Sequence, residues 1–135
     1  MVGTLLAACG SAPSKDDYIS RGDAICKQTT TAQAKVTAPA KGDLAGTARY
    51  LQTSANLIDA ELQQLKKLSR PSGDSGRLGD LFSREGDAIT TLRNAAKAAA
   101  AGDQMTADAL FKQGQNELSD VAAGLHDYGF DVCGA

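Results

Sequence analysis

Three cysteines are the residues of this chain with the most clearly defined chemistry. They are Cys9, Cys26 and Cys133, and the first stands in the run 5–11 (LLAACGS). A branched apolar residue three positions before a cysteine, here Leu6, followed by two small residues and then Gly or Ser after the cysteine, is typical of a lipobox. The sequence therefore predicts cleavage before Cys9 and attachment of lipid to its thiol.

The other two cysteines are predicted to form a disulfide. An odd cysteine count in an exported chain leaves one thiol to be explained, and lipidation of Cys9 would account for it. Cys26 and Cys133 then remain as a pair in a compartment that is oxidising enough to join them. Such a bond closes a loop of about 107 residues, which the chain-entropy model credits with about 5 kcal/mol. Neither cysteine belongs to a CxxC motif, so we expect no redox motif and no zinc site.

The chain is expected to divide into a short leader, a tether and one domain. Residues 1–8 resemble a signal segment, but the apolar run 2–8 is at the lower limit of the roughly 7–15 residues of a signal core, and no Lys or Arg precedes it. We therefore expect the true start to lie upstream of Met1. Residues 9–13 would be the lipid-anchored tether and residues 14–135 a single domain, on the outer face of the cytoplasmic membrane. The alternative is a cytosolic protein with an apolar start.

The remaining chemistry-bearing residues give no catalytic, cofactor or metal site. A di-metal carboxylate bundle needs Glu-x-x-His pairs on facing helices, but Ala123 stands three residues before His126, which is the only histidine. Haem ligation by His126 and Met105 would join residues about six turns apart on one helix. A hydrolytic triad has no Gly-x-Ser-x-Gly motif to support it. We expect His126 to be exposed or partly buried near a helix C-terminus.

The acidic residues and the Gly-rich loop are also predicted to be structural. The loop 72–76 (SGDSG) lacks a preceding strand and a Gly-Lys-Ser/Thr ending, so we interpret it as a linker and not a phosphate cradle. One set of acidic residues is predicted to lie on solvated helix faces: Glu61, Glu85, Asp87, Glu117 and Asp120. A second, charged set near the start of the first helix is predicted to stabilise that helix through its dipole and through an Arg21–Asp17 pair: Asp16, Asp17, Arg21 and Asp23.

Composition and periodicity predict an all-α fold. The chain has 135 residues with 4% aromatic residues, no Trp and a formal net charge of −2, so no basic field for nucleic acid is present. Apolar residues recur at spacings of three and four in four segments, which predict helices over about 15–37, 43–68, 77–101 and 104–128. Short connections between long helices predict an antiparallel up-down-up-down four-helix bundle, closed by the Cys26–Cys133 disulfide.

The first predicted helix has a weak inner face. Around Thr29 and Ala32 the run 28–33 (QTTTAQ) is polar, which is unusual for a bundle core. We favour the interpretation that these small residues let helices approach closely. The alternative is a groove lined by polar side chains that binds a ligand.

The two ends of the domain resemble a known group of proteins. The lipobox, the run 18–26 (YISRGDAIC) and the run 128–134 (YGFDVCG) are similar to small secreted proteins and lipoproteins of actinobacteria, which are largely uncharacterised helical proteins. The resemblance implies an exported helical protein whose two outer cysteines pair. It implies no activity, substrate or catalytic residue.

The function expected from the sequence is therefore a non-enzymatic binding or accessory module of the cell envelope. It would be held at the membrane through lipid on Cys9 and would contact an envelope protein that the sequence does not identify. The alternative is a carrier of a small apolar ligand in a cavity of the bundle. An interaction module predicts an exposed apolar patch and a carrier predicts a cavity of several hundred Å³. An enzyme predicts titratable groups with perturbed pKa values in a cleft.

Overall fold

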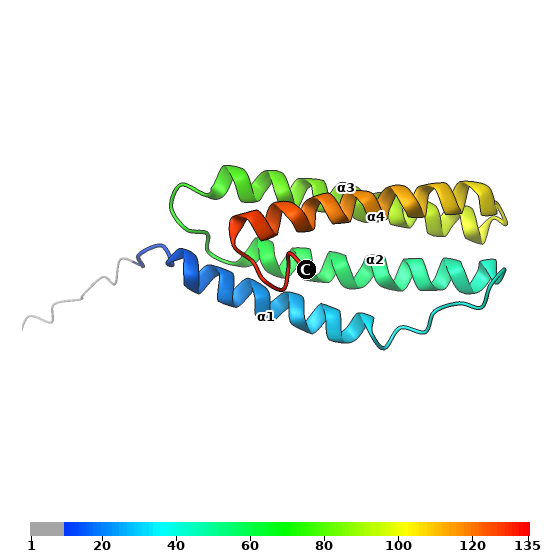
Figure 1. Cartoon of the computed structure of the whole chain (residues 1–135), viewed down its shortest axis with the longest axis horizontal. Coiled ribbons are helices and arrows are strands. Elements are labelled where there is room, and N and C mark those ends of the chain that lie inside the picture. The colour runs from blue at the N-terminus through cyan, green and yellow to red at the C-terminus, as the bar shows by residue number, and fades with distance from the viewer. Residues whose placement is uncertain (1–9) are drawn as a thin grey trace, which may run out of the picture.

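The computed structural model describes residues 10–135, which form four antiparallel helices (Figure 1). They are α1 (Lys15–Gln33), α2 (Leu44–Lys67), α3 (Ser75–Ala100) and α4 (Gln104–Tyr128), and no strand occurs among the described residues. The all-α, up-down-up-down bundle predicted from periodicity is confirmed. Within the same residues, none of the four helices combines the length and the apolar composition that a bilayer span requires. Cys9 and the predicted leader lie outside the described residues.

Local chemistry explains most of the helix starts. Side-chain oxygens of Ser14, Asp43 and Asp103 each accept a hydrogen bond from a backbone N–H in the first helical turn, at 3.1, 2.8 and 3.1 Å. These bonds satisfy donors that have no partner inside a helix. Asp74 precedes α3 without such a cap, because its carboxylate instead accepts a 2.7 Å hydrogen bond from the Tyr128 hydroxyl. That bond joins the end of α4 to the α2–α3 loop at one pole of the bundle.

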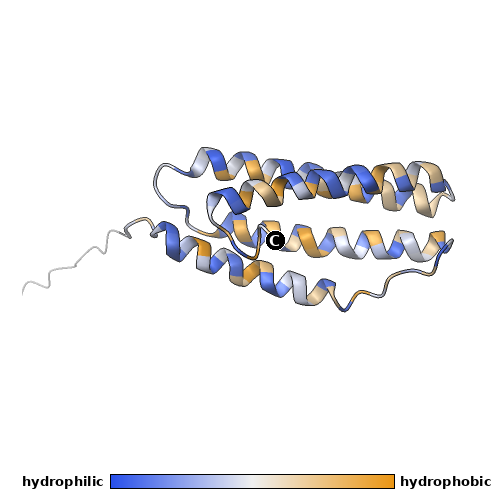
Figure 2. Ribbon diagram, in the orientation of Figure 1, coloured by the Kyte–Doolittle hydropathy of each residue, from blue (hydrophilic) through white to orange (hydrophobic). Residues whose placement is uncertain are grey.

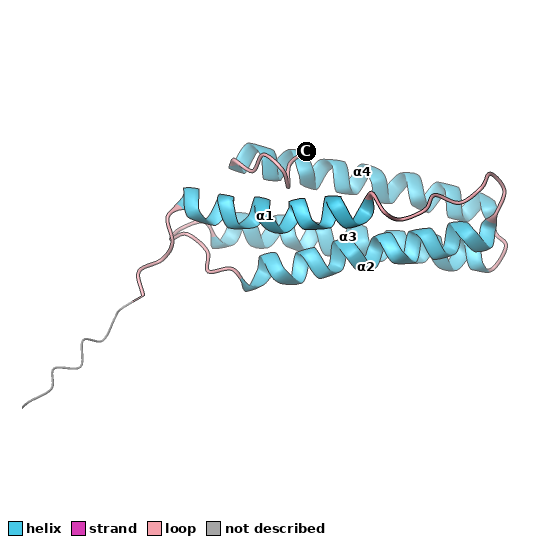
Figure 3. Ribbon diagram, turned by 90° about the horizontal axis from the view of Figure 1, so that it is seen from below, coloured by secondary structure: helices cyan, strands magenta, loops and turns pink. Residues whose placement is uncertain are grey.

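The predicted length of the first helix is wrong. α1 ends at Gln33 and not at residue 37, whereas α3 begins at Ser75, two residues earlier than predicted. Near the end of α1, Thr30 and Thr31 turn their hydroxyls back onto carbonyls four residues earlier, and no apolar side chain is buried after Cys26. The last turn of α1 therefore gains little stability from packing. The segment 34–43 then continues without helix to the far pole, where α2 begins (Figure 3).

The core lies mainly between α2, α3 and α4. The closely packed helix pairs are α3 with α4, α2 with α3, and α1 with α2, so α1 is attached to the other helices chiefly through α2. The buried apolar cluster draws residues from all four helices, and hydrophobic and hydrophilic segments alternate along each helix (Figure 2). A smaller cluster at the far pole contains Leu51, Ala95 and Ala96.

The tail 129–135 occupies part of the seam between α1 and α4 (Figure 1). Its Phe130 is buried against Tyr18 and Tyr128, with ring centroids 5.9 and 5.6 Å apart. The Cys26–Cys133 disulfide then fixes the tail to α1, with the two Cα atoms 5.2 Å apart. The disulfide predicted from cysteine parity is confirmed.

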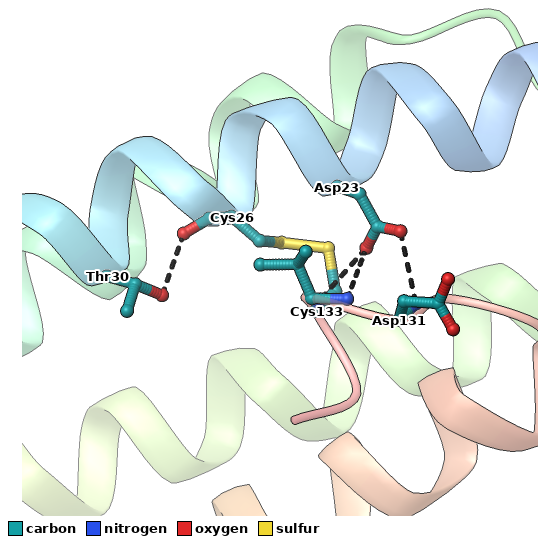
Figure 4. The surroundings of a disulfide bond; sticks show 6 residues. Asp23, Cys26, Thr30, Asp131 and Cys133 are labelled. Carbon is teal, nitrogen blue, oxygen red and sulfur yellow. Dashed lines mark hydrogen bonds between the residues drawn. A yellow bond between two sulfur atoms is a disulfide. The ribbon is translucent and has the colours of Figure 1, made fainter.

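A carboxylate on α1 supports the same attachment, and sequence reasoning missed it. Asp23, one turn before Cys26, accepts hydrogen bonds from the backbone N–H groups of Asp131, Val132 and Cys133 at 3.1, 2.8 and 3.0 Å (Figure 4). Three bonds to one carboxylate orient the tail strongly, since charge-assisted hydrogen bonds are stronger than neutral ones.

Gly22 is the position where α1 and the tail approach most closely. A Cβ atom at Gly22 would overlap the ring of Phe130, which is buried and has little room to move. We expect Gly22→Ala to lower the free energy of unfolding by roughly 1–3 kcal/mol, even though alanine favours helix. Gly86→Ala is the matched control, because its Cβ would meet only Leu62 at 3.9 Å. It is expected to raise stability by about 0.5–1 kcal/mol. Denaturant unfolding measures both, and a shift in the same direction for the two variants would contradict this account.

Candidate ligand-binding groove

An open groove runs along the gap between α2 and α4, with α1 and the tail beside it. It consists of two adjoining hollows of about 630 and 560 Å³. The residues that line both hollows are Ile58, Glu61, Gln115, Leu118, Cys133 and Ala135. The first hollow extends along α4 to His126 and down to Glu85 on α3. The second extends under α1 to Gln33, and to Tyr50 on α2.

The short α1 and the small side chains of α4 explain why the groove is not filled. The α1–α4 pair is not among the closely packed helix pairs, so the tail and not a helix occupies that seam. On α4 the groove is lined at Ser119, Ala122 and Ala123 by side chains of one or two heavy atoms. Larger apolar side chains, among them Ile58 and Leu118, line its walls.

Glu85 places a buried carboxyl group at the floor of the first hollow. Its side chain is 3% exposed, and its Oε2 atom has no hydrogen-bond partner. Burial is the main cause that raises the pKa of Glu85 to about 8, the negative charge of Glu61 raises it further, and Lys66 partly opposes both. At neutral pH the group is therefore mostly protonated when the groove is empty.

Glu61 is the second carboxyl group of the groove. It is half-buried on α2 and lines both hollows. Burial raises the pKa of Glu61 above its usual value, and an interaction with the Thr29 hydroxyl of α1 partly opposes that effect. Two carboxyls that face the same space with raised pKa values hold fewer than two negative charges at neutral pH.

A second unpaired acceptor lies in the other hollow. Gln33 donates from Nε2 to the Ser54 hydroxyl at 2.7 Å, which joins α1 to α2, but its buried Oε1 atom has no partner. The groove therefore contains two buried oxygen atoms, on Glu85 and Gln33, that can accept hydrogen bonds and do not. Buried polar atoms are normally paired, so these two are exceptions that need an explanation.

The structure corrects the prediction for Glu85. Sequence analysis placed it with Glu61, Asp87, Glu117 and Asp120 on solvated faces, whereas Glu85 is buried in the core face of α3. The helical spacing already indicated that Glu85 lies on the buried face, because it stands four residues after Leu81 and four before Ile89, both of which are buried. A carboxylate in register with an apolar stripe is a candidate for burial.

The structure also tests the predictions for His126, Thr29 and the Arg21–Asp17 pair. His126 is exposed and lies at the end of the groove, while Met105, at the opposite end of α4, is 82% exposed, so the structure does not bring these two together. Thr29 lines the second hollow, which agrees with the less favoured prediction of a polar groove. The predicted Arg21–Asp17 pair is not formed, and the one ion pair within residues 10–135 joins Arg93 to Asp59 at 2.8 Å.

No cluster suited to a metal occurs among the residues that the structure describes: no three His, Cys, Asp or Glu side chains there could hold one ion together. The chain was also compared with family models, with curated proteins and with solved structures, and nothing matched in any of the three comparisons. The resemblance to actinobacterial proteins stays a prediction. The groove is therefore the feature from which a function has to be argued.

Burial of Glu85 should make stability depend on pH. Its pKa is raised in the folded protein, so between about pH 4.5 and 8 the unfolded chain releases a proton that the folded chain retains. The free energy of unfolding should therefore fall as pH rises through this window, and the full penalty applies above about pH 8. We expect Glu85→Gln to remove this fall. The free energy of unfolding of the variant, relative to that of the native chain, should therefore increase by up to roughly 4–5 kcal/mol between pH 4.5 and pH 9.

Denaturant unfolding at a series of pH values measures this gain. Glu117→Gln is the matched control for the exchange, because Glu117 also lies on a bundle helix with one buried, unpaired carboxylate oxygen but lines a separate surface hollow. A difference between the native chain and Glu85→Gln that stays constant from pH 4.5 to 8 would contradict the assignment.

Proposed function

We propose that this protein is a lipid-anchored, non-enzymatic binding protein on the outer face of the cytoplasmic membrane, and that it binds a small organic ligand in the α2–α4 groove. The observation that carries the proposal is the groove itself, with its apolar walls and its two unpaired buried acceptors. Ligand sites of this kind combine about 300–1,000 Å³ of mostly apolar space with a few polar groups that fix orientation.

The location rests on the lipobox and on the disulfide. A disulfide between residues far apart in the sequence fits an oxidising compartment outside the cytoplasm. Lipid on Cys9 would supply the two acyl chains that stable anchoring needs, whereas one chain binds a membrane only marginally. Anchoring at the surface would also raise the local concentration of the protein for ligands and partners there.

A small ligand explains the surface better than a protein partner does. A docking module should expose a contiguous apolar patch, but among residues 10–135 Met105 is the only large apolar side chain that is exposed. The apolar surface of the groove lines two hollows of about 630 and 560 Å³, a size that suits a small molecule. The surface of the protein therefore favours the carrier alternative over the accessory module.

Binding also explains the groove better than catalysis does. Two carboxyls with raised pKa values would suit an enzyme. Catalysis by such groups in a covalent mechanism, however, also needs a nucleophile that a neighbouring base can activate. Ser119 and His126 both line the groove, yet they stand seven residues apart on α4, which is about 10 Å along the helix. A hydroxyl nucleophile and its base must lie within hydrogen-bond distance of each other.

Mass spectrometry of the protein from native membranes tests the anchor. We expect a mature chain that begins at Cys9, carries a diacylglyceryl group on that residue, and lacks the two hydrogens of a closed disulfide. An uncleaved N-terminus with three free thiols would overturn the assigned location.

A groove-filling variant tests the site. The neutral fluorescent probe N-phenyl-1-naphthylamine should bind the 135-residue chain, and Ser119→Phe, which extends into the first hollow, should weaken that binding by roughly tenfold or more. Asn116→Phe is the matched control, because Asn116 is exposed on the same helix and does not line the groove. Equal binding by both variants, or no binding by the native chain, would contradict the proposed site.

A further inference from the structure

The unpaired polar atoms of the groove share one chemical property. Gln33 Oε1 is a hydrogen-bond acceptor, and the carboxyl of Glu85, whose Oε2 atom is also unpaired, has only acceptors once it is ionised. A ligand that satisfies them must therefore bring donors. A buried acceptor without a partner is costly, so a donor that reaches it gains more than it would at an exposed site.

The charges around the first hollow also favour a positive ligand. Glu85 and Glu61 contribute two carboxyls, and neither is part of an ion pair in the described structure. The cationic group that acts on Glu85 is Lys66, which is exposed on α2. A ligand cation would supply the partner that the protein does not.

We propose that the groove binds an amphiphilic primary amine, with its ammonium group between Glu85 and Glu61 and its apolar body along the groove. This inference rests on the proposed function, because it names the chemical class of the ligand for the same site. Both carboxyls line the first hollow, together with the apolar side chains of Ile58, Leu118, Val121 and Leu125. An ammonium group has three donors, enough for both carboxyls and one further acceptor.

Other ligand classes fit the same residues less well. A metal ion needs more ligands than two carboxylates, and none of the described residues completes such a set. Once Glu85 is ionised, at about pH 8 and above, a fatty acid would place its carboxylate beside a like charge, which repels it. A neutral alcohol could donate one hydrogen bond but could not balance a carboxylate charge.

The binding of an amine should be coupled to the release of a proton. The charges that act on Glu85 are those of Glu61 and Lys66 on α2, and His126 of α4 lines the same hollow; the side chains of α1 and the tail that line the groove, Thr29 and Cys133 among them, are not ionisable. Burial raises the pKa of Glu85 to about 8, so below that pH an ammonium ion must displace a proton from it. The apparent affinity for an amine should therefore rise as pH increases from 6 to 8.

A series of ligands that differ only in the head group tests this inference on the 135-residue chain with its disulfide closed. Decylamine, decanol and decanoate, below their micelle concentrations, compete with N-phenyl-1-naphthylamine. At pH 8 we expect decylamine to bind roughly 10- to 100-fold more tightly than decanol, and decanoate to bind more weakly than decanol. Butylamine has the same head group without the apolar body and should compete poorly. Decylamine should gain roughly tenfold or more in affinity between pH 6 and pH 8, whereas decanol should gain nothing.

Two variants identify the responsible carboxyl. Glu85→Gln should reduce the advantage of decylamine over decanol to less than about threefold and remove the rise with pH. A rise that persists in Glu85→Gln would assign the effect to another group, such as Glu61, whose pKa burial also raises, and would contradict the role of Glu85. Glu117→Gln, outside the groove, should keep the full advantage of the amine.

The outcomes separate the two proposals. If the probe and decanol do not bind, or bind without regard to Ser119→Phe, the proposed function fails and this inference fails with it. If both bind in the groove but decylamine has no advantage over decanol at pH 8, only the inference is overturned. Should Glu85→Gln fail to fold, the comparison of head groups on the native chain still decides between these outcomes.

Discussion

The attachment of the C-terminal tail to α1 is the constraint on which the rest of the structure depends. α1 packs closely against α2 alone, so without the tail it would be held along one side only. The disulfide supplies a covalent link at Cys26, and three hydrogen bonds to Asp23 fix the direction of the tail one turn earlier. Phe130, buried against Gly22, anchors the start of the tail. The disulfide thus reduces the conformational entropy of the unfolded chain, while the Asp23 carboxylate and the Phe130 ring fix the position of the tail in the folded protein.

The same attachment creates the groove. A fourth helix-to-helix seam would bury the apolar faces of α1 and α4 against each other, as in a regular four-helix bundle. Here a chain without helical structure occupies part of that seam, and α1 stops before it covers the far half of α2. Cys133 and Ala135 of the tail line both hollows. The groove therefore exists because α1 and α4 do not pack against each other along their full length.

Periodicity and cysteine parity were sufficient to predict the helices, their antiparallel order and the disulfide, because these depend on spacing along the chain. The end of α1 was not predictable in this way, since the polar run 28–33 is compatible with helix and only the absence of a packing partner ends it. Asp23 could not be recognised because its three partners are backbone groups more than 100 residues away. Glu85 was recognisable from its register between Leu81 and Ile89, but the identity of the facing residues, which decides burial, is a tertiary property.

The position of Glu85 is the strongest argument that the groove has a function. A leucine there would continue the apolar stripe of α3 and would require no partner, so the carboxyl lowers stability at neutral pH without a structural gain that the described residues reveal. Asp23 shows the contrast, since its carboxylate is fully used in holding the tail. A buried acidic group that its own fold leaves unpaired, in the lining of an open groove, is the observation on which the proposed ligand site rests. Because that group is protonated when empty and attracts a cation when ionised, exchange of a proton for a ligand cation follows from burial itself and requires no change in the backbone.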